Sequence, residues 1–278
     1  MNILELTALL GAGACVAGFV GSLTGLGGGV VLVPLLTLAF GVDIRYAVGT
    51  ALVSVIATSS GAAAAYVREG YSNLRLGIFF EVATTLGALA GAFVAAWAPT
   101  RAIAVIFGLV LLSSAAFSWR RQAAAVRDAP PDPLAVRLKL AGTFPEAAGS
   151  RAYAPRRIPL AFGLMGFAGV LSGLLGIGSG AFKVLAMDRV MRLPYKVSTT
   201  TSNFMIGVTA AASAGIYISR GYVDPGLAMP VVLGVLAGAA IGTKVLASAR
   251  AGALRLFFAA VIVLLAVEMI VQGIRGAV

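Results

Sequence analysis

The sequence has no histidine, a single cysteine and few charged residues. Without histidine it lacks the commonest proton shuttle and the commonest metal ligand, which argues against a metalloenzyme and gives no reason to expect a cofactor. Cys15 has no partner for an intramolecular disulfide or a cysteine metal site. Only 11% of the 278 residues are charged, whereas 60% are hydrophobic. Because soluble domains carry about 25% charged residues, this composition indicates a protein of the lipid bilayer.

Long apolar runs follow one another along the whole chain. Each is about 18 residues or longer, which is enough for a helix to cross the hydrocarbon core. The runs lack the alternation of polar and apolar residues that a membrane β-barrel needs. We therefore predict an all-α integral membrane protein. The clearest runs are residues 47–66, 76–98, 102–119, 227–249 and 254–271.

The chain is internally duplicated. Shifting the sequence against itself by 151 positions brings Gly25 onto Gly176 and aligns the two halves without a gap. Between the halves, Pro, Ala and Arg residues break the hydrophobic pattern, as a linker does. We predict a first transmembrane repeat (residues 1–119), a linker (120–158) and a second repeat (159–278). Other matched pairs are Thr50 and Thr201, Tyr66 and Tyr217, Gly87 and Gly238, and Phe107 and Phe258.

Each half reads as a glycine-tipped helix, a short helix and three full spans. In the first half the predicted ranges are 4–24, 29–41, 46–66, 75–98 and 101–119. The short helix rises only about 18 Å, against a hydrocarbon core of about 30 Å. Its glycine end should therefore lie at membrane depth, in a broken or re-entrant helix pair.

The net charge of +11 comes mainly from basic residues between the apolar segments, which is typical of a membrane protein and argues against a nucleic-acid partner. The linker carries eight Lys and Arg residues, which predicts a cytoplasmic linker. If each short pair returns to its starting side, the repeats are inverted, with 14 basic loop residues inside and four outside. If each pair crosses the membrane, the repeats are parallel and the division is 12 to six. The inverted arrangement fits the positive-inside rule better.

Two glycine clusters are the first candidate binding elements. A helix that begins inside the membrane presents unpaired N–H groups and the positive end of its dipole, which suits an anion. Glycines would let the ligand approach that backbone, although they could instead serve only close helix packing. The residues concerned are Gly27, Gly28 and Gly29 in the first half and Gly178, Ser179 and Gly180 in the second.

Polar side chains near these clusters are further candidates. Lys183 follows the second cluster where the first half has Leu32, and it either attracts the transported anion or snorkels to an interface. Hydroxyl and amide groups on the next helix could complete the anion's hydrogen bonds, or could serve only helix packing and the preceding turn. They are Thr201, Ser202 and Asn203, with Thr50 as the counterpart of Thr201.

Glu81 is the only acidic residue well inside a span of the first half. Burial would favour its protonated form, so Glu81 is a candidate proton carrier and protons are a candidate coupling ion. The alternative is an interfacial position, because Arg75 lies about a turn and a half away along the helix.

The glycine motifs resemble those of a known family. Residues 18–29 (GFVGSLTGLGGG) and 169–180 (GVLSGLLGIGSG) resemble the paired signature of the TauE/SafE permeases, and Thr50 and residues 201–203 are also similar to that family's motifs. The similarity covers both halves and leaves out the linker. It implies a bacterial inner-membrane permease for sulfite, organosulfonates or related sulfur-containing anions, without ATP hydrolysis in the same chain.

The interpretation that follows is a multi-pass secondary transporter that moves a small anion by alternating access at a midplane site between the repeats. An anion channel built on the same re-entrant pair is one alternative, and its flux would be uncoupled. An intramembrane enzyme is another, and without histidine it would need a Ser-Lys or carboxylate mechanism.

Overall fold

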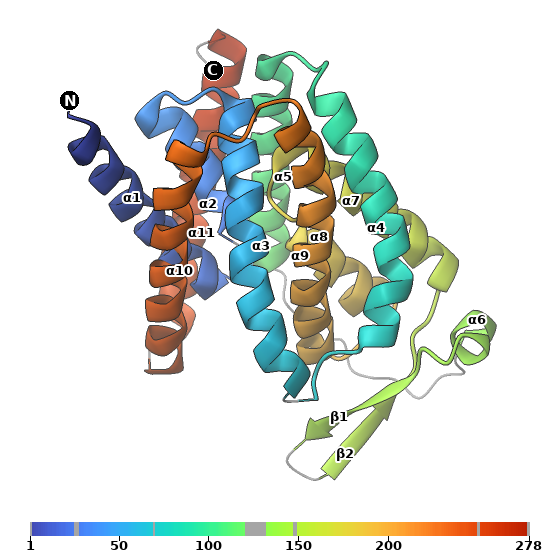
Figure 1. Cartoon of the computed structure of the whole chain (residues 1–278). Helices are drawn as coiled ribbons and strands as arrows, with labels where there is room; N and C mark the ends of the chain where they lie inside the picture. The colour runs from blue at the N-terminus through green and yellow to red at the C-terminus, as the bar shows by residue number, and fades with distance from the viewer. Residues whose placement is uncertain are drawn as a thin grey trace.

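The computed structural model describes residues 2–24, 28–68, 70–119, 132–146, 149–248 and 251–276, and these residues are mostly helical (Figure 1). Short π-helical segments, η1 and η2, directly continue α2 and α8. The first half contains α1 (Ile3–Thr24), α2 (Gly29–Pro34), η1 (Leu35–Ala39), α3 (Ile44–Arg68), α4 (Leu74–Ala95) and α5 (Thr100–Trp119). The second half contains α7 (Ile158–Leu175), α8 (Gly180–Leu185), η2 (Ala186–Val190), α9 (Tyr195–Ser219), α10 (Pro225–Ser248) and α11 (Ala251–Arg275). The predicted helix ranges of the first half are confirmed to within a few residues.

The central pair of helices is α3 and α9, which lie side by side (Figure 1). On one flank α1 packs along α10, and on the other α4 packs along α7. α5 packs against α11. The central pair is connected to both flanks, because α3 also contacts α10 and α2, and α9 also contacts α4, α7 and α8.

The two short helices return toward the end from which their partners came. α1 runs inward from the end where the chain begins, and α2 with η1 runs back to that end (Figure 1). α7 runs inward from the opposite end, and α8 with η2 runs back to it. The loop that follows each π-helical segment closes in the same way, because Val42 N–H donates to Leu36 O and Leu193 N–H donates to Met187 O, both at 3.0 Å.

Glycines allow the outer helix pairs to approach closely. A Cβ at Gly238 of α10 would overlap the Cys15 carbonyl in α1, and a Cβ at Gly87 of α4 would overlap the Gly166 carbonyl in α7. Each of these helices therefore presents backbone, without a side chain, to its partner. The two contacts differ by the same 151 residues, so the duplication visible in the sequence is also a duplication of packing.

Four of the described helices are long and apolar enough to cross a membrane: α1, α4, α7 and α10, with apolar windows at Leu4–Gly21, Leu74–Ala95, Ile158–Leu175 and Pro225–Gly242. α3 and α9 have 25 residues each and are long enough, but their hydroxyl residues lower their hydropathy. Much of this polarity is buried, with Thr50 and Thr201 both fully buried. The central helices thus turn polar groups inward, where other helices shield them from lipid.

The linker departs from the all-α prediction. It contains a short helix, α6 (Pro133–Arg137), and an antiparallel hairpin of β1 (Gly142–Glu146) and β2 (Gly149–Tyr153). The hairpin is anchored at the start of α4, where the Asn73 amide nitrogen donates to Tyr153 Oη at 3.0 Å and to Leu140 O at 3.1 Å. Burial raises the pKa of the Tyr153 hydroxyl. The strands are short and their turn-rich sequence has no clear alternation, so nothing in the hydrophobic pattern revealed them.

Candidate functional site

Two glycine turns meet beside the middle of α3. The first turn leads into α2 through Gly28 and Gly29, and the second leads into α8 through residues 176–180. A Cβ on Gly29 would lie 2.7 Å from the Gly176 carbonyl oxygen and 3.1 Å from Val55 Cγ2. The two turns are therefore in backbone contact, and the contact brings together the glycine clusters that the sequence marks as binding elements. Gly28 and Gly29 begin the first short helix and are buried. Gly27, the remaining candidate of this cluster, lies outside the described residues.

The second glycine turn is wedged between α3 and α9. Gly176 and Gly178 have φ values of +69° and +66°, which glycine adopts without steric cost. A Cβ on Gly178 would lie 2.7 Å from Ile206 Cγ2, so the position has no room for a side chain either. Ser179 also has a positive φ, +47°, and begins the short helix that Gly180 opens. A serine held in this conformation is strained, and its hydroxyl oxygen is buried without a partner.

Lys183 lies on α8, three residues after Gly180 of the second glycine turn, and it is fully buried. Its Nζ donates to the Thr209 hydroxyl oxygen on α9 at 2.5 Å. The same hydroxyl lies 2.6 Å from Glu81 Oε1 on α4 and 2.7 Å from Met205 O. Lys183 therefore does not snorkel, and Glu81, only 7% exposed, does not lie at an interface. The Thr209 hydroxyl joins the Lys183 and Glu81 side chains, and we call Glu81, Lys183 and Thr209 the polar cluster.

The Glu81 carboxylate is only partly satisfied. Thr85 donates to Oε1 at 3.1 Å, in addition to the contact from Thr209. Oε2 is buried and has no hydrogen-bond partner. Because an unpaired buried carboxylate oxygen is costly, this atom is a place where a proton or a ligand would bring a gain in free energy.

The polar cluster exists on one side of the duplicated scaffold only. The 151-residue offset takes Lys183 to Leu32, Thr209 to Thr58 and Glu81 to Val232. Leu32 is fully buried like Lys183. The equivalent position in the other half thus has the same helices but no charge, and the asymmetry must come from the side chains rather than from the backbone.

The predicted polar run on α9 divides among several roles. Ser202 Oγ lies 3.4 Å from Gly180 O and so touches the second glycine turn. Thr201 accepts the Asn73 N–H at 3.0 Å, which fixes the start of α4. Asn203 is half-buried beside Ser202. Of this run, Ser202 is the side chain that reaches the glycine turns through a hydrogen bond.

Thr50 and Thr201 lie on opposite sides of the glycine turns. Each is five residues from the α3 or α9 residue that contacts Gly178, namely Val55 and Ile206, and the two helices run in opposite directions (Figure 1). Five residues of helix correspond to about 7 Å, so the two hydroxyls are separated by about 15 Å along the bundle. They do not form one site, although the Thr50 hydroxyl oxygen is buried and unpaired.

Thr209 is the member of the polar cluster that sequence reasoning missed. A spacing of four residues links Thr201, Met205, Thr209 and Ser213, and all four are buried. Such spacing places side chains on one helix face. A hydroxyl stripe extending beyond residue 203 was therefore the available signal. No comparable signal joined Glu81 to Lys183, because 102 residues separate them in the sequence.

The bundle and its buried polar cluster define a membrane protein with a polar interior site, the general design of transporters. Within the described ranges, no three His, Cys, Asp or Glu side chains are grouped so as to hold a metal ion. Residues 10–269 match the family model described as "Sulfite exporter TauE/SafE". The chain therefore belongs to the TauE/SafE family and is a membrane transporter by family.

Relatives with similar sequences carry transporter names. The chain is 27% identical over 267 residues to the "Probable membrane transporter protein YunE" of Bacillus subtilis (strain 168), covering 93% of this chain and 95% of that one. It is 28% identical over 231 residues to "Probable membrane transporter protein YdhB" of the same organism, covering 82% and 84%. A "Probable membrane transporter protein" of Xylella fastidiosa (strain 9a5c) is 26% identical over 244 residues, covering 87% and 85%. No solved structure matches the chain.

Proposed function

We propose that this protein is a secondary transporter that moves a small anion, sulfite or an organosulfonate, across the bacterial inner membrane by alternating access. The transporter class comes from the family and the relatives' names. The observation that carries the anion is Lys183, a fully buried cation next to two glycine turns in contact. Sulfur as the central atom of the cargo is taken from the family's description, "Sulfite exporter".

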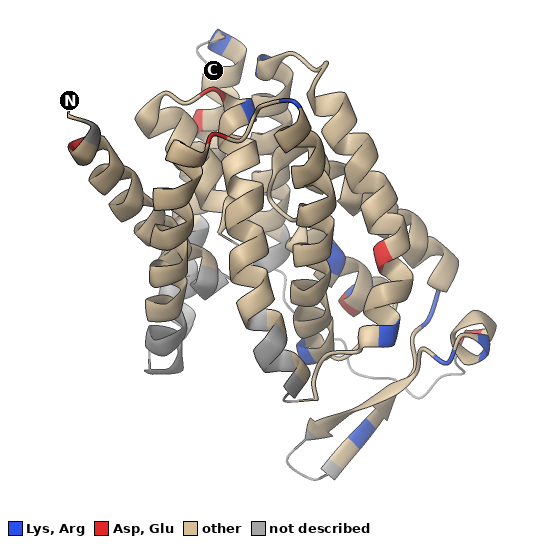
Figure 2. Ribbon diagram, in the orientation of Figure 1, with Lys and Arg blue, Asp and Glu red and all other residues tan. Residues whose placement is uncertain are grey.

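Two inverted repeats, residues 1–119 and 159–278, form the moving parts in this proposal, joined by a linker over residues 120–158. The paired glycine contacts at a constant offset support the repeats, and the opposite directions of α3 and α9 support their inversion. Basic residues gather at the end of the bundle that carries the hairpin (Figure 2). The positive-inside rule then assigns the linker to the cytoplasm.

The substrate site in this proposal lies at the glycine turns. Lys183 supplies the positive charge, and the buried, unpaired Ser179 hydroxyl together with Ser202 supplies hydrogen-bond donors. Gly29 of the first half and Gly176 of the second are in backbone contact there, so both halves border the site. An anion bound there would contact both repeats, so moving one repeat against the other would change which side can reach it.

Proton coupling through the polar cluster is part of this proposal, and the count of hydrogen-bond donors and acceptors supports it. The Thr209 hydroxyl has one proton and two acceptors within reach, Glu81 Oε1 and Met205 O. It can donate to an ionised Glu81, or it can donate to Met205 while accepting from a protonated Glu81. Protonation of Glu81 also removes the negative charge that balances Lys183, which leaves the ammonium free to bind an anion. Anion and proton would then bind together.

Flux through proteoliposomes tests the proposal. Purified protein is reconstituted and uptake of sulfite, sulfate, thiosulfate and methanesulfonate is followed with and without an imposed pH gradient. We expect saturable uptake of at least one sulfur oxyanion, accelerated by the gradient, lost in Lys183→Met and no longer gradient-dependent in Glu81→Gln. Lys139→Met, which removes an exposed linker cation, should transport normally.

Three outcomes would count against the proposal. Folded protein without flux of any anion would remove the anion as cargo. Flux that rises linearly with concentration and ignores the gradient would favour a channel. Unchanged transport by Lys183→Met would move the site away from the glycine turns.

A further inference from the structure

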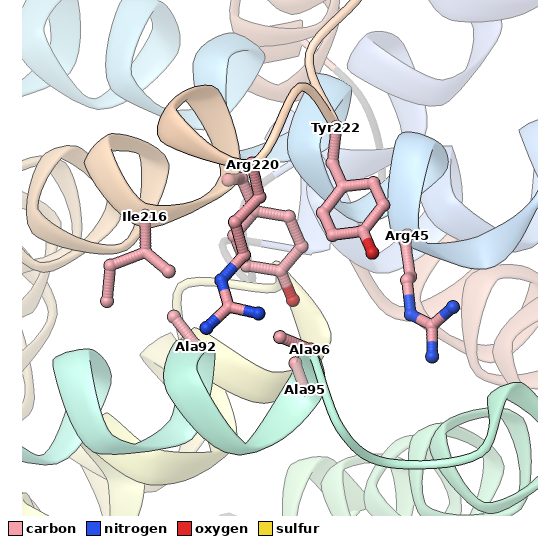
Figure 3. Close-up of a pocket in the computed structure, with 8 residues that line it drawn as sticks. Arg45, Ala92, Ala95, Ala96, Ile216, Arg220 and Tyr222 are labelled. Atoms are coloured by element: carbon pink, nitrogen blue, oxygen red, sulfur yellow. The ribbon is translucent and has the colours of Figure 1, made fainter.

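At the end of the bundle opposite the hairpin (Figure 1), a recess too narrow for a water molecule lies between the first half and the second (Figure 3). It lies near the start of α3 and the end of α9, next to the second glycine turn, because Val48, three residues after Arg45, contacts Gly176. We call it the outer recess. Arginine, tyrosine and small apolar residues line it: Arg45, Ala92, Ala95, Ala96, Ile216, Tyr217, Arg220 and Tyr222.

Arg45 is held in place by its surroundings but keeps hydrogen-bonding capacity. One terminal nitrogen donates to Ala98 O at 2.9 Å, and the guanidinium carbon lies 5.8 Å from the centre of the Tyr222 ring. Its Nε is buried with no partner. Guanidinium groups bind oxyanions through several N–H donors at once, and an arginine with a free buried N–H is suited to that task.

Arg220 provides the second cation of the outer recess. Its guanidinium lies over two aromatic rings, 5.4 Å from the centre of Phe93 and 6.0 Å from that of Trp97. Figure 3 shows the Tyr222 ring between the Arg45 and Arg220 side chains. The recess therefore combines two guanidinium groups from opposite halves around one phenol.

The recess lining contains no carboxylate, so its two positive charges are not balanced from within. The acidic residues nearest in sequence are engaged with backbone: Asp43 accepts the Arg45 N–H at 2.9 Å, and Asp224 accepts the Gly226 N–H at 2.7 Å. In the part of the chain that the structure describes, the two guanidiniums contact aromatic rings and a carbonyl oxygen instead of an acid. This is an electrostatic setting that favours a bound anion.

The opposite end of the bundle repeats the main element of this recess. Lys196 lies 5.2 Å from the centre of the Tyr71 ring, and the 151-residue offset takes Arg45 to Lys196 and Tyr222 to Tyr71. A cation over a tyrosine ring thus stands at each end of the region between the halves. The repetition follows from the duplication of the chain, and it leaves a cation at each end of the region where the two halves meet.

We propose that the outer recess is a capture site for the anionic substrate, in which Arg45 and Arg220 bind a small oxyanion before it reaches the glycine turns. The ligand class is an anion with several oxygens on one centre, such as sulfite, sulfate or a sulfonate, because its oxygens offer separate acceptors to two guanidiniums once the side chains part to admit it. The proposal rests on the proposed function in one respect, namely that the cargo is an anion.

Trp97 is a natural reporter for this site, because its ring contacts Arg220 and the sequence has only two tryptophans. In a Trp119→Phe background, Trp97 emission is titrated with sulfate, sulfite or methanesulfonate at constant ionic strength, with chloride as the reference ion. We expect a saturable change for the oxyanions and none for chloride. Arg220→Gln and Arg45→Gln should each raise the apparent Kd about tenfold, the loss of one charge-assisted contact.

Arg101→Gln is the matched control, because Arg101 lies at the start of α5 at the same end of the bundle but outside the recess. It should leave the apparent Kd within about twofold of the parent value, a difference below about 0.4 kcal/mol. In transport, Arg45→Gln should raise KM and leave kcat nearly unchanged, as expected for a residue that acts before translocation.

The outcomes separate this inference from the proposed function. A flat titration, or one that Arg101→Gln weakens as much as Arg45→Gln, overturns the capture site even if the parent protein transports anions. A saturable titration that is weakened about tenfold in both recess variants supports the capture site even if reconstituted protein shows no flux. In that case the transport proposal is the one that fails.

Discussion

Replacing Lys183 by methionine should destabilise the protein about as much as replacing Lys183 and Glu81 together. The two bonds through Thr209, 2.5 and 2.6 Å long, place Lys183 Nζ and Glu81 Oε1 no more than about 5.1 Å apart. At that separation and an effective dielectric constant of about 20, opposite unit charges attract by about 3 kcal/mol. Each single replacement discards this attraction and leaves one charge buried alone.

The expected pattern is therefore strongly non-additive. Lys183→Met and Glu81→Gln should each lower the free energy of unfolding by about 3 kcal/mol, in the range measured when one partner of a buried pair is removed. Independent effects would give about 6 kcal/mol for the double variant, but the second replacement removes a charge that has already lost its partner. The double variant should lose about 3 kcal/mol, which makes the coupling energy about 3 kcal/mol.

Unfolding by SDS in mixed micelles, followed by circular dichroism, gives the four free energies of this cycle. Glu268→Gln combined with Lys183→Met is the control pair, because Glu268 lies exposed on α11 and is bonded to Gln272. That pair should be additive within about 0.5 kcal/mol. A coupling energy below about 0.5 kcal/mol between Lys183 and Glu81 would refute the reasoning, since it would mean that solvent or lipid screens the two charges from each other.

Three further changes test the packing. Gly238→Leu should prevent or severely weaken folding, because its side chain would overlap the Cys15 carbonyl, whereas Gly163→Leu, which meets only open space, should keep the parent melting temperature in detergent. Thr201→Val removes the acceptor of the N–H that starts α4 and should cost about 1 kcal/mol in the same SDS titration. The raised pKa of Tyr153 means that its neutral form is favoured in the folded protein, so its contribution is full below pH about 10 and is lost as the pH rises further. Tyr153→Phe removes this titrating group, so its melting temperature should fall less than that of the parent between pH 8 and about 11.

Most of the fold could be predicted because it depends on local patterns and on one internal comparison. Apolar runs give the helices, and glycine clusters mark the breaks before α2 and α8. Shifting the sequence by 151 positions also predicts packing, because Gly87 and Gly238 occupy matching contacts in the two halves. The hairpin of the linker could not be predicted in this way. Its position depends on the hydrogen bond between Asn73 and Tyr153, which are 80 residues apart in the sequence.

The candidate site could be predicted only in part. Lys183 and Glu81 each stand out from the sequence, because a charged side chain interrupts an apolar segment, but their pairing does not. Glu81 reaches Lys183 through Thr209, and that contact depends on how α4, α8 and α9 pack together. Thr50 and Thr201 show the opposite case, because matched positions in a duplicated sequence can lie far apart when the two copies run in opposite directions.

The apolar counterpart of the polar cluster indicates that the cluster is not required for packing. Leu32 fills the position of Lys183 and is equally buried, in a half with the same helices and the same glycine contacts. Burying an ammonium and a carboxylate carries a desolvation cost that their attraction has to offset, and an apolar set avoids that cost. A side chain that packing alone does not require, at a place where burial is expensive, is most simply explained by function. Since the backbone is duplicated and the charges are not, we expect ligand or proton binding at the polar cluster and not at its apolar counterpart around Leu32.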